Sequence, residues 1–281
     1  LRPFEDYEVT RPVPEDLEWV VINEPSRAPL GVFVENTIIP HVKAGRSCSI
    51  VGDAGTGKTQ ALKAIEADLK QQGLSYVKLC LSHVGARNLG EGGQVVHSFV
   101  MRCIVRGTCK VDAVLLDEIL FVSIDLIAAL ETLRLRGTRI ICFGDFEQLP
   151  PISNRWRGCP VQADVFERSR LFKQWSDCTK FVLTECRRND EPHFAFYTAV
   201  KQRPLTEALA DAMQRYPQQP GNAVWNICIS HARRRRVNKH IQQQLAEAYQ
   251  RTHSACTLKV EGAVEYGCFP GTRLVGCNNS H

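Results

Sequence analysis

The chain has 281 residues, of which 44% are hydrophobic and 23% are charged, and its formal net charge at pH 7 is +5. A chain of this length and composition can bury two cores of ordinary domain size, which excludes an intrinsically disordered protein. The first thirty residues carry seven acidic and three basic side chains, so their charge is −4 and the rest of the chain carries +9. A basic body suits a polyanionic partner, although an ordinary soluble enzyme can have the same charge.

Residues 1–30 combine this acidic excess with five prolines, a composition typical of an extended segment. We therefore expect an acidic leader over residues 1–30, followed by the folded part of the chain. The sequence leaves the role of this leader open.

Residues 52–59 read Gly-Asp-Ala-Gly-Thr-Gly-Lys-Thr and match the phosphate-binding loop pattern G-x-x-x-x-G-K-[ST] in full. An apolar strand pattern at 47–51 precedes them and a helix-forming pattern at 60–70 follows, which is the order that this motif requires. The glycines let backbone N–H groups point at phosphate oxygens, Lys58 can reach the β- and γ-phosphates, and the Thr59 hydroxyl can ligate Mg²⁺. The sequence therefore predicts a site for a nucleoside triphosphate. Its binding residues are Gly52, Asp53, Ala54, Gly55, Thr56, Gly57, Lys58 and Thr59.

An acidic pair, Asp117-Glu118, ends the almost wholly apolar run at 111–116, which is typical of a buried strand. A carboxylate at the carboxyl end of a parallel strand beside the phosphate loop can hold Mg²⁺, and a second one can orient or deprotonate the attacking water. Such a pair alone is also common at the start of a helix. Because it follows Thr59 at Walker B spacing, we assign Asp117 to the metal and Glu118 to the water.

A second apolar strand pattern, at 138–143, leads into Gly-Asp-Phe-Glu-Gln-Leu-Pro-Pro at 144–151. This segment resembles motif III of superfamily 1 helicases, most closely the 5′-to-3′ group that includes the RecD, TraI and Pif-type enzymes. In that family the glutamine senses the γ-phosphate and couples it to bound single-stranded nucleic acid, so the resemblance assigns this catalytic role to Gln148. A Gly-Asp turn stiffened by two prolines explains the backbone but not the glutamine.

The resemblance extends to two segments between the phosphate loop and the acidic pair. A strand pattern at 76–81 precedes Ser82 and His83, where family members have their motif Ia, and His97 and Ser98 occur in a family-like Val-His-Ser-Phe sequence. By resemblance these four side chains contact nucleic acid. A structural role is the alternative for the two histidines.

Residues 181–188 resemble motif IV, a short strand that leads into arginine. In these motors a second RecA-like domain closes over the nucleotide and supplies an arginine to the transferring phosphate, whose developing charge it stabilises. The resemblance assigns this role to Arg187, with Arg188 as the second choice. A solvated surface pair is the alternative.

A later segment has a strand pattern at 227–229, a turn at Ser230 and His231, and a long helical pattern through Gln250. By resemblance Ser230 and His231 contact the nucleic-acid backbone. The four consecutive arginines at 233–236 either bind phosphates, act as a nuclear address or form a solvated helix face.

The twelve cysteines include no Cys-x-x-Cys pair, and several lie inside apolar strand patterns, where free cysteine behaves as a small hydrophobic residue. We expect a reducing intracellular compartment, the nucleus or the cytoplasm, and leave a viral or mobile-element origin open. The sequence contains no apolar run of the roughly 20 residues that span a bilayer and no signal-peptide pattern at its start.

The combined motifs predict an α/β fold, a P-loop NTPase with two RecA-like parallel-sheet domains, the second incomplete. The expected division is 1–30 for the leader, 31–178 for the ATP-binding domain and 179–281 for part of the second domain. Because the chain begins with leucine and we find no motifs V and VI, we expect a fragment.

The resemblance implies an enzyme, an ATP-dependent DNA helicase that couples ATP hydrolysis to 5′-to-3′ movement on single-stranded DNA, with ATP and Mg²⁺ bound. A P-loop ATPase of another class and an inactive nucleic-acid-binding relic are the alternatives. RNA in place of DNA, polarity, oligomeric state and pathway stay open. Base selectivity also stays open, because residues 28–51 lack the glutamine with which the family reads adenine.

Overall fold

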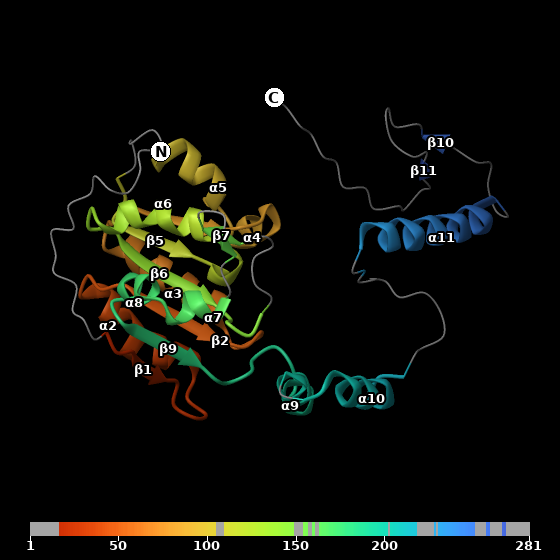
Figure 1. The fold of residues 1–281 in the computed structure, drawn as a ribbon, viewed down its shortest axis with the longest axis horizontal. Coiled ribbons are helices and arrows are strands. Elements are labelled where there is room, and N and C mark those ends of the chain that lie inside the picture. Colours follow the sequence, from red (N-terminus) through yellow and green to blue (C-terminus); the bar gives the residue numbers. More distant parts are fainter. Residues whose placement is uncertain are drawn as a thin grey trace. The chain divides into compact units, whose positions relative to one another are not determined.

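The computed structural model describes residues 17–104, 110–148, 154–156, 159–160, 163–201, 203–217, 228, 230–250, 257–258 and 266–267 (Figure 1). By its internal contacts the chain divides into two compact units, Leu1–Leu205 and Thr206–His281. Each unit is described by itself below.

A sheet of seven parallel strands forms the centre of the first unit, in the spatial order β1-β9-β2-β6-β5-β3-β4. Because every neighbouring pair is parallel, all carboxyl ends of the strands lie at one edge of the sheet. In spatial order the strands are β1 (Val20–Asn23), β9 (Thr179–Leu183), β2 (Cys48–Gly52), β6 (Arg139–Gly144), β5 (Ala113–Leu116), β3 (Tyr76–Cys80) and β4 (Gly93–Val95).

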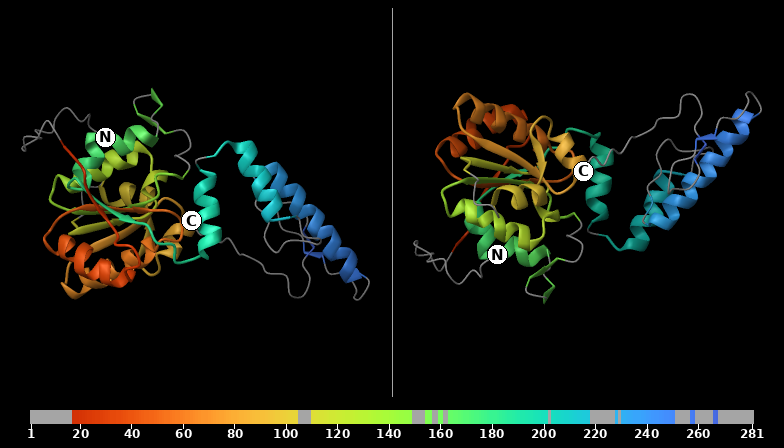
Figure 2. Two further views of the ribbon diagram at one scale, coloured as in Figure 1. Left: turned by 90° about the horizontal axis from the view of Figure 1, so that it is seen from below. Right: turned by 90° about the horizontal axis from the view of Figure 1, so that it is seen from above.

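Both faces of this sheet are buried, as expected for a parallel sheet of apolar strands. On β5, Ala113 and Leu115 belong to one hydrophobic cluster, and Val114 and Leu116 belong to the other. Helices cover the two clusters on opposite sides, which Figure 2 shows as red and orange helices on one side and green helices on the other. The result is a three-layer α/β/α unit, and the predicted P-loop NTPase fold with a RecA-like parallel sheet is confirmed.

The helices of each layer alternate with the strands along the chain. The first layer contains α1 (Leu30–Phe33), the π-helical turn η2 (Val34–Ile38), α2 (Ile39–Lys43) and α3 (Lys58–Gln71). The second layer contains α5 (Val96–Phe99), the π-helical turn η3 (Val100–Ile104), the 3₁₀ turn η4 (Ile119–Phe121), α6 (Ile124–Arg134), α7 (Ala163–Arg168) and α8 (Arg170–Trp175). This unit also contains α4 (His83–Asn88), α9 (Glu191–Val200) and a short antiparallel pair of β7 (Arg155–Trp156) and β8 (Cys159–Pro160).

The structure corrects the expected domain boundary at residue 178. The strand β9 lies inside the first sheet, between β1 and β2, and its Phe181 and Leu183 side chains are each 1% exposed in the core of that sheet. The strand β1 is the edge strand, so residues within the expected leader 1–30 also belong to this domain. Sequence patterns located β9 as a strand but assigned it to the wrong sheet.

The second unit contains α10 (Leu205–Arg215), α11 (His231–Gln250) and a short antiparallel pair of β10 (Thr257–Leu258) and β11 (Tyr266–Gly267). The predicted helix through Gln250 is confirmed. No parallel strand pair occurs among the residues described in this unit. A second RecA-like domain therefore stays a prediction, and most of the strand pattern expected at 227–229 lies outside the described residues.

The helix α10 exposes large apolar side chains at Leu209 and Met213, which are 57% and 67% exposed.

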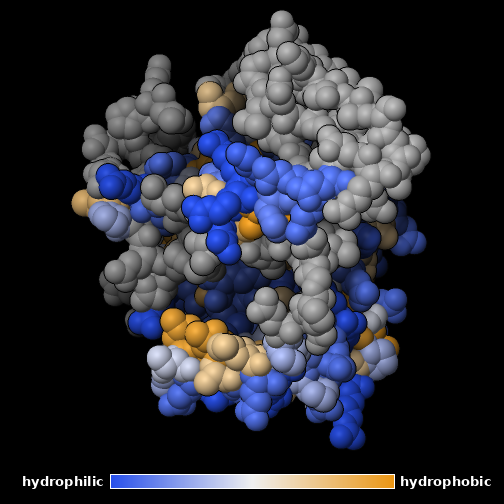
Figure 3. All heavy atoms as spheres, turned by 90° about the vertical axis from the view of Figure 1, so that its right-hand side faces the viewer, coloured by the Kyte–Doolittle hydropathy of each residue, from blue (hydrophilic) through white to orange (hydrophobic). Residues whose placement is uncertain are grey.

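On the face seen in Figure 3, the coloured residues are mostly hydrophilic and the hydrophobic ones form small clusters. Within the part of the chain that the structure describes, no helix combines the length and apolarity needed to cross a membrane.

The corrected boundary predicts how shortened chains behave. A chain ending at residue 178 should lose cooperative unfolding, because it lacks β9 and with it the buried side chains of Phe181 and Leu183. Burial of each such side chain contributes about 2–5 kcal/mol, against a net stability of about 5–15 kcal/mol for a whole domain. A chain ending at Leu205 keeps the complete sheet and should unfold cooperatively. Thermal denaturation followed by circular dichroism measures both, and equal transitions would contradict the placement of β9.

Candidate nucleotide-binding site

The predicted phosphate and metal residues come together at the carboxyl edge of the sheet. The strands β2, β6 and β5 are consecutive neighbours, and the phosphate loop, Asp145 and Asp117 follow them directly. Segments that are far apart in the sequence therefore meet beside one another. This is the edge at which ligands bind in open parallel sheets.

The phosphate loop takes backbone conformations that glycine adopts at least cost. Gly55 has φ +88° and Gly57 has φ +103°, both in the left-handed region. Space is limiting as well, since a Cβ on Gly57 would lie 2.5 Å from Cδ2 of Leu30, and one on Gly52 would lie 2.5 Å from the carbonyl oxygen of Leu183. Backbone conformation thus favours glycine at positions 55 and 57, and packing favours it at positions 52 and 57.

Lys58 is the first residue of α3, and its ammonium is turned back into the loop. Its Nζ donates hydrogen bonds to the carbonyl oxygens of Gly52, at 2.5 Å, and Asp53, at 2.8 Å. Burial lowers the pKa of Lys58, because desolvation penalises the charged form. Three carboxylates oppose this shift; in decreasing order they are Asp145, Asp117 and Asp53. The Lys58 ammonium therefore lies among the carboxylates of all three segments.

The acidic pair follows β5 with two different environments. Asp117 is held by main-chain contacts: its N–H donates to the Leu79 carbonyl at 2.8 Å, and its Oδ1 accepts from the Glu118 N–H at 3.0 Å. Burial raises the pKa of the Asp117 carboxyl, and the charge of Glu118 raises it further. Glu118 itself has φ 54°, which is uncommon for a residue other than glycine, and its side chain is exposed.

A buried thiol contacts the Glu118 carboxylate. Sγ of Cys80, the last residue of β3, donates to Oε2 of Glu118 at 3.5 Å. Burial raises the pKa of the Cys80 thiol to about 11, so the thiol stays protonated and can act as this donor. Sequence analysis noted Cys80 only as an apolar strand residue.

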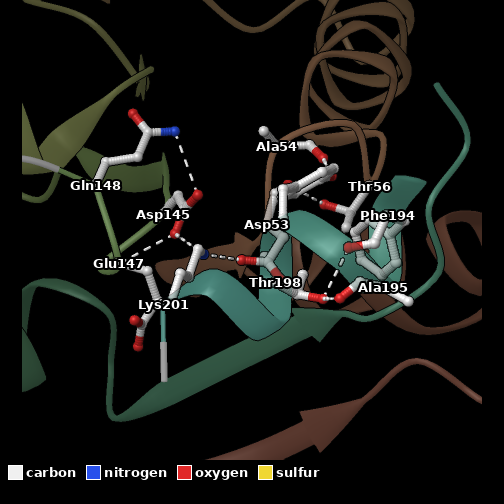
Figure 4. Close-up of polar contacts among 12 residues, drawn as sticks. Asp53, Ala54, Thr56, Asp145, Glu147, Gln148, Phe194, Ala195, Thr198 and Lys201 are labelled. Atoms are coloured by element: carbon white, nitrogen blue, oxygen red, sulfur yellow. Dashed lines mark hydrogen bonds and ion pairs between the residues drawn. The ribbon is translucent and has the colours of Figure 1, made fainter. Parts of the chain in front are cut away.

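Asp145 organises the segment that carries Gln148 (Figure 4). Its Oδ1 accepts from the Glu147 N–H at 3.0 Å, and its Oδ2 accepts from Nε2 of Gln148 at 3.3 Å. The Asp145 side chain is only 5% exposed, so these bonds form away from bulk water. The hydrogen bond to the Asp145 carboxylate thus orients the Gln148 side chain. Residues 149–151 of this motif lie outside the described residues.

Arg187 lies behind the phosphate loop in the same unit as the loop, which corrects the expectation that a second domain supplies it. Its guanidinium forms an ion pair with Glu24, whose side chain is fully buried, and donates to the Thr56 carbonyl at 2.8 Å. Its backbone N–H donates to the Gly55 carbonyl at 2.8 Å. Arg188, in contrast, is exposed, and its positive charge lowers the pKa of Lys58. Contact of Arg187 with a phosphate stays a prediction.

Four of the six expected nucleic-acid residues lie beyond the carboxyl ends of β3 and β4. Ser82 caps α4, because its Oγ accepts from the Gly85 N–H at 2.9 Å, so its hydroxyl has a structural role. His83 is exposed on α4, and His97 and Ser98 are exposed on α5. In the other unit, Oγ of Ser230 accepts from the Arg233 N–H at 3.2 Å, and His231 begins α11. Contact of any of these residues with nucleic acid stays a prediction.

Sequence analysis missed α9 and its contacts with the phosphate loop. The Tyr197 hydroxyl donates to the Ala54 carbonyl at 2.5 Å, and Lys201, just after the helix, forms an ion pair with Asp53. The start of this helix could have been predicted, since Asp190 caps it and Pro192 lies in its first turn. The contact between Tyr197 and Ala54 has no local sequence pattern, because the two residues are 143 positions apart.

A parallel sheet with a glycine loop, a loop lysine and an acidic pair at its carboxyl edge defines a P-loop NTPase domain. A family model described as an AAA domain matches residues 38–194, more than half of the chain, and the chain therefore belongs to this family.

One curated protein and two solved structures are similar to this chain. Human ATP-dependent DNA helicase PIF1 is 25% identical over 212 residues, which are 65% of this chain and 31% of that protein. The structure of Bacteroides Pif1 bound to ssDNA matches with a TM-score of 0.56 at 18% identity, covering 76% of this chain and 57% of that one. Bacteroides Pif1 in complex with ADP-AlF4 matches with a TM-score of 0.55 at 18% identity and the same coverage of 76% and 57%. The resemblance to Pif-type enzymes is confirmed. The chain spans 31% of the human PIF1 protein and 34% of the mouse one.

Replacement of Asp117 by asparagine should raise thermal stability at neutral pH. Because the pKa of Asp117 in the folded protein lies above its ordinary value, the folded state binds the proton more tightly than the unfolded state. Stability therefore falls as the pH rises from about 4, the ordinary value, through the raised one. Asparagine carries no charge, so its advantage, a few degrees at most, exists above this window and disappears below it.

Thermal denaturation of both proteins at pH 7 and at acidic pH measures this effect. Asp125→Asn is the matched control, because this carboxylate is exposed in the first turn of α6, where its charge is favourable. A variant at position 117 that is less stable than the unaltered protein at pH 7 would contradict the inferred cost of burying this carboxylate.

Proposed function

We propose that this chain is the nucleotide-binding part of an ATP-dependent DNA helicase that moves 5′ to 3′ along single-stranded DNA. One observation carries the proposal: the phosphate loop, the acidic pair and the segment of Gln148 meet at one edge of a single sheet. The human relative is named an ATP-dependent DNA helicase, and the Bacteroides relative was solved with ssDNA bound, which supports DNA as the polymer.

Lys58 and the loop N–H groups hold the triphosphate in this proposal. The Lys58 ammonium now donates to two carbonyl oxygens of its own loop. Phosphate oxygens carry full charges and form stronger charge-assisted bonds than carbonyl oxygens, so they displace these acceptors. The ammonium then stabilises the charge that develops on the transferring phosphoryl group.

The donors at the site fit Mg²⁺. Asp117 offers a carboxylate whose orientation is fixed by main-chain bonds, and Thr59 offers an exposed hydroxyl in the first turn of α3. Both are hard oxygen ligands, which Mg²⁺ prefers, and few protein ligands suffice when phosphates complete the shell. When bound, Mg²⁺ would neutralise part of the phosphate charge during the displacement.

Glu118 orients the attacking water and accepts its proton. The exposed carboxylate is available to solvent, whereas the pKa of its neighbour Asp117 is raised by burial. The Cys80 thiol holds one carboxylate oxygen and leaves the other for the water.

Gln148 couples the phosphates to bound DNA in this proposal. Its side chain donates to Asp145 of the same segment, and the charge of Asp145 acts in turn on the Lys58 ammonium of the phosphate loop. The proposed DNA contacts at the same edge of the sheet are Ser82, His83, His97 and Ser98, and those in the second unit are Ser230 and His231. We also propose that the protein functions in a reducing intracellular compartment. The cysteines that the structure describes are free thiols, and such compartments keep thiols reduced.

Removal of the loop ammonium tests the nucleotide site. Lys58→Ala should lower the rate of ATP hydrolysis by about a hundredfold or more, because it removes stabilisation of the transferring phosphoryl group. The measurement is phosphate release with and without single-stranded DNA, and Lys63→Ala, an exposed lysine on the same helix, is the control. Hydrolysis by the unaltered chain that ignores DNA would favour a P-loop ATPase of another class, and hydrolysis that survives Lys58→Ala would refute the site.

The two adjacent arginines should have different effects. Arg187→Ala leaves the buried Glu24 carboxylate unpaired, so we expect a loss of about 3–5 kcal/mol of stability. Arg188→Ala removes an exposed side chain and should leave the melting temperature unchanged while lowering kcat about a hundredfold, if it is the arginine that reaches the phosphates. Melting curves and steady-state kinetics of both variants decide. Unchanged stability with lost turnover in Arg187→Ala would support the catalytic assignment to Arg187.

A further inference from the structure

Lys201, just after α9, lies between two segments of the nucleotide site (Figure 4). Its ammonium forms an ion pair with Asp53 of the phosphate loop and is 3.9 Å from Oδ1 of Asp145 in the motif III segment. These two carboxylates come from loops that follow different strands, β2 and β6. A single positive charge thus joins the loop that holds phosphates to the segment that carries Gln148.

Both aspartates have further bonds inside their own segments. The carbonyl of Asp53 accepts hydrogen bonds from Nζ of Lys58 and from the Thr56 hydroxyl. Asp145 accepts from the side chain of Gln148. Asp53 thus connects Lys201 to the Lys58 ammonium, and Asp145 connects Lys201 to Gln148.

The surroundings make this ion pair stronger than an ordinary surface pair. The Lys201 and Asp53 side chains are each 27% exposed, and Asp145 is 5% exposed. Solvent screening is reduced at such partly buried positions. The helix before Lys201 is also anchored, because Tyr197 donates to the Ala54 carbonyl next to Asp53. The lysine is thus fixed to the loop by two contacts from one helix.

We propose that Lys201 is a positioning residue for ATP hydrolysis, which sets the motif III segment, and with it Gln148, at a fixed distance from the phosphate loop. This inference rests on the proposed function. Lys201 acts through Asp145 and not on the phosphates directly. Its loss leaves the phosphate-binding groups in place but allows the motif III segment to move away from them.

The test measures ATP hydrolysis by the full chain with and without saturating single-stranded DNA. For Lys201→Met, which keeps the apolar stem and removes the charge, we expect kcat with DNA to fall about tenfold, a loss of about 1.4 kcal/mol of transition-state stabilisation. The KM for ATP should change less than about twofold, because Lys58 and the loop N–H groups still bind the phosphates. Lys201→Arg, which keeps the charge, should restore most of the rate.

Two controls separate positioning from other effects. Lys63→Met removes an exposed lysine from α3 and should leave kcat, KM and DNA stimulation unchanged. In an Asp145→Asn background, Lys201→Met should cost much less than tenfold, because its partner in the motif III segment has already lost its charge. If Lys201→Met does not fold, Lys201→Gln carries the same expectation.

The outcomes distinguish this inference from the proposed function. If the unaltered chain hydrolyses ATP in a manner that depends on Lys58 and DNA, but Lys201→Met matches it in kcat, only the inference is overturned. A variant whose KM rises while kcat stays unchanged would also overturn it, since that result describes a phosphate contact. Absence of Lys58-dependent hydrolysis in the unaltered chain would overturn both.

Discussion

The parallel pairing of β2 with β9 and β6 is the constraint on which the rest of the structure depends. Because these strands run in one direction, everything that follows them leaves the sheet at the same edge. The phosphate loop, the Asp145 segment and the residues after β9 are adjacent for this reason alone. The register of these strands determines which polar residues come first beyond the edge.

This arrangement concentrates charge where water is scarce. Burial lowers the pKa of Lys58 and raises that of Asp117, so the fold brings both groups into an environment that disfavours their charged forms. Neighbouring charges of opposite sign offset part of the cost for Lys58. The ammonium and the carboxylate of the site therefore carry a desolvation cost that the neighbouring charges offset only in part. Such stored cost at a binding edge is typical of sites built for function rather than for stability.

The phosphate loop, α3, the acidic pair and the core strands could be predicted because their signals are local: glycine spacing, apolar runs and a lysine at a helix start. The placement of β9 in this sheet could not be predicted, because an apolar run identifies a strand without identifying its neighbour. The neighbouring strand β2 is about 130 positions earlier in the chain. The same limit applies to Arg187 and Glu24, which pair across 163 positions. Short β1 and β4 gave no signal, since one lies near a proline-rich segment and the other contains glycine and glutamine.

The contacts that sequence patterns missed share a common origin in the chain after β9. Arg187 holds the Thr56 carbonyl from behind the loop, and Tyr197 and Lys201 hold Ala54 and Asp53 from the following helix. The phosphate loop is thus enclosed by residues that come more than 130 positions later. Because coupling between two sites is reciprocal, a phosphate that shifts this loop also shifts the free energy of α9 and of the chain that continues from it.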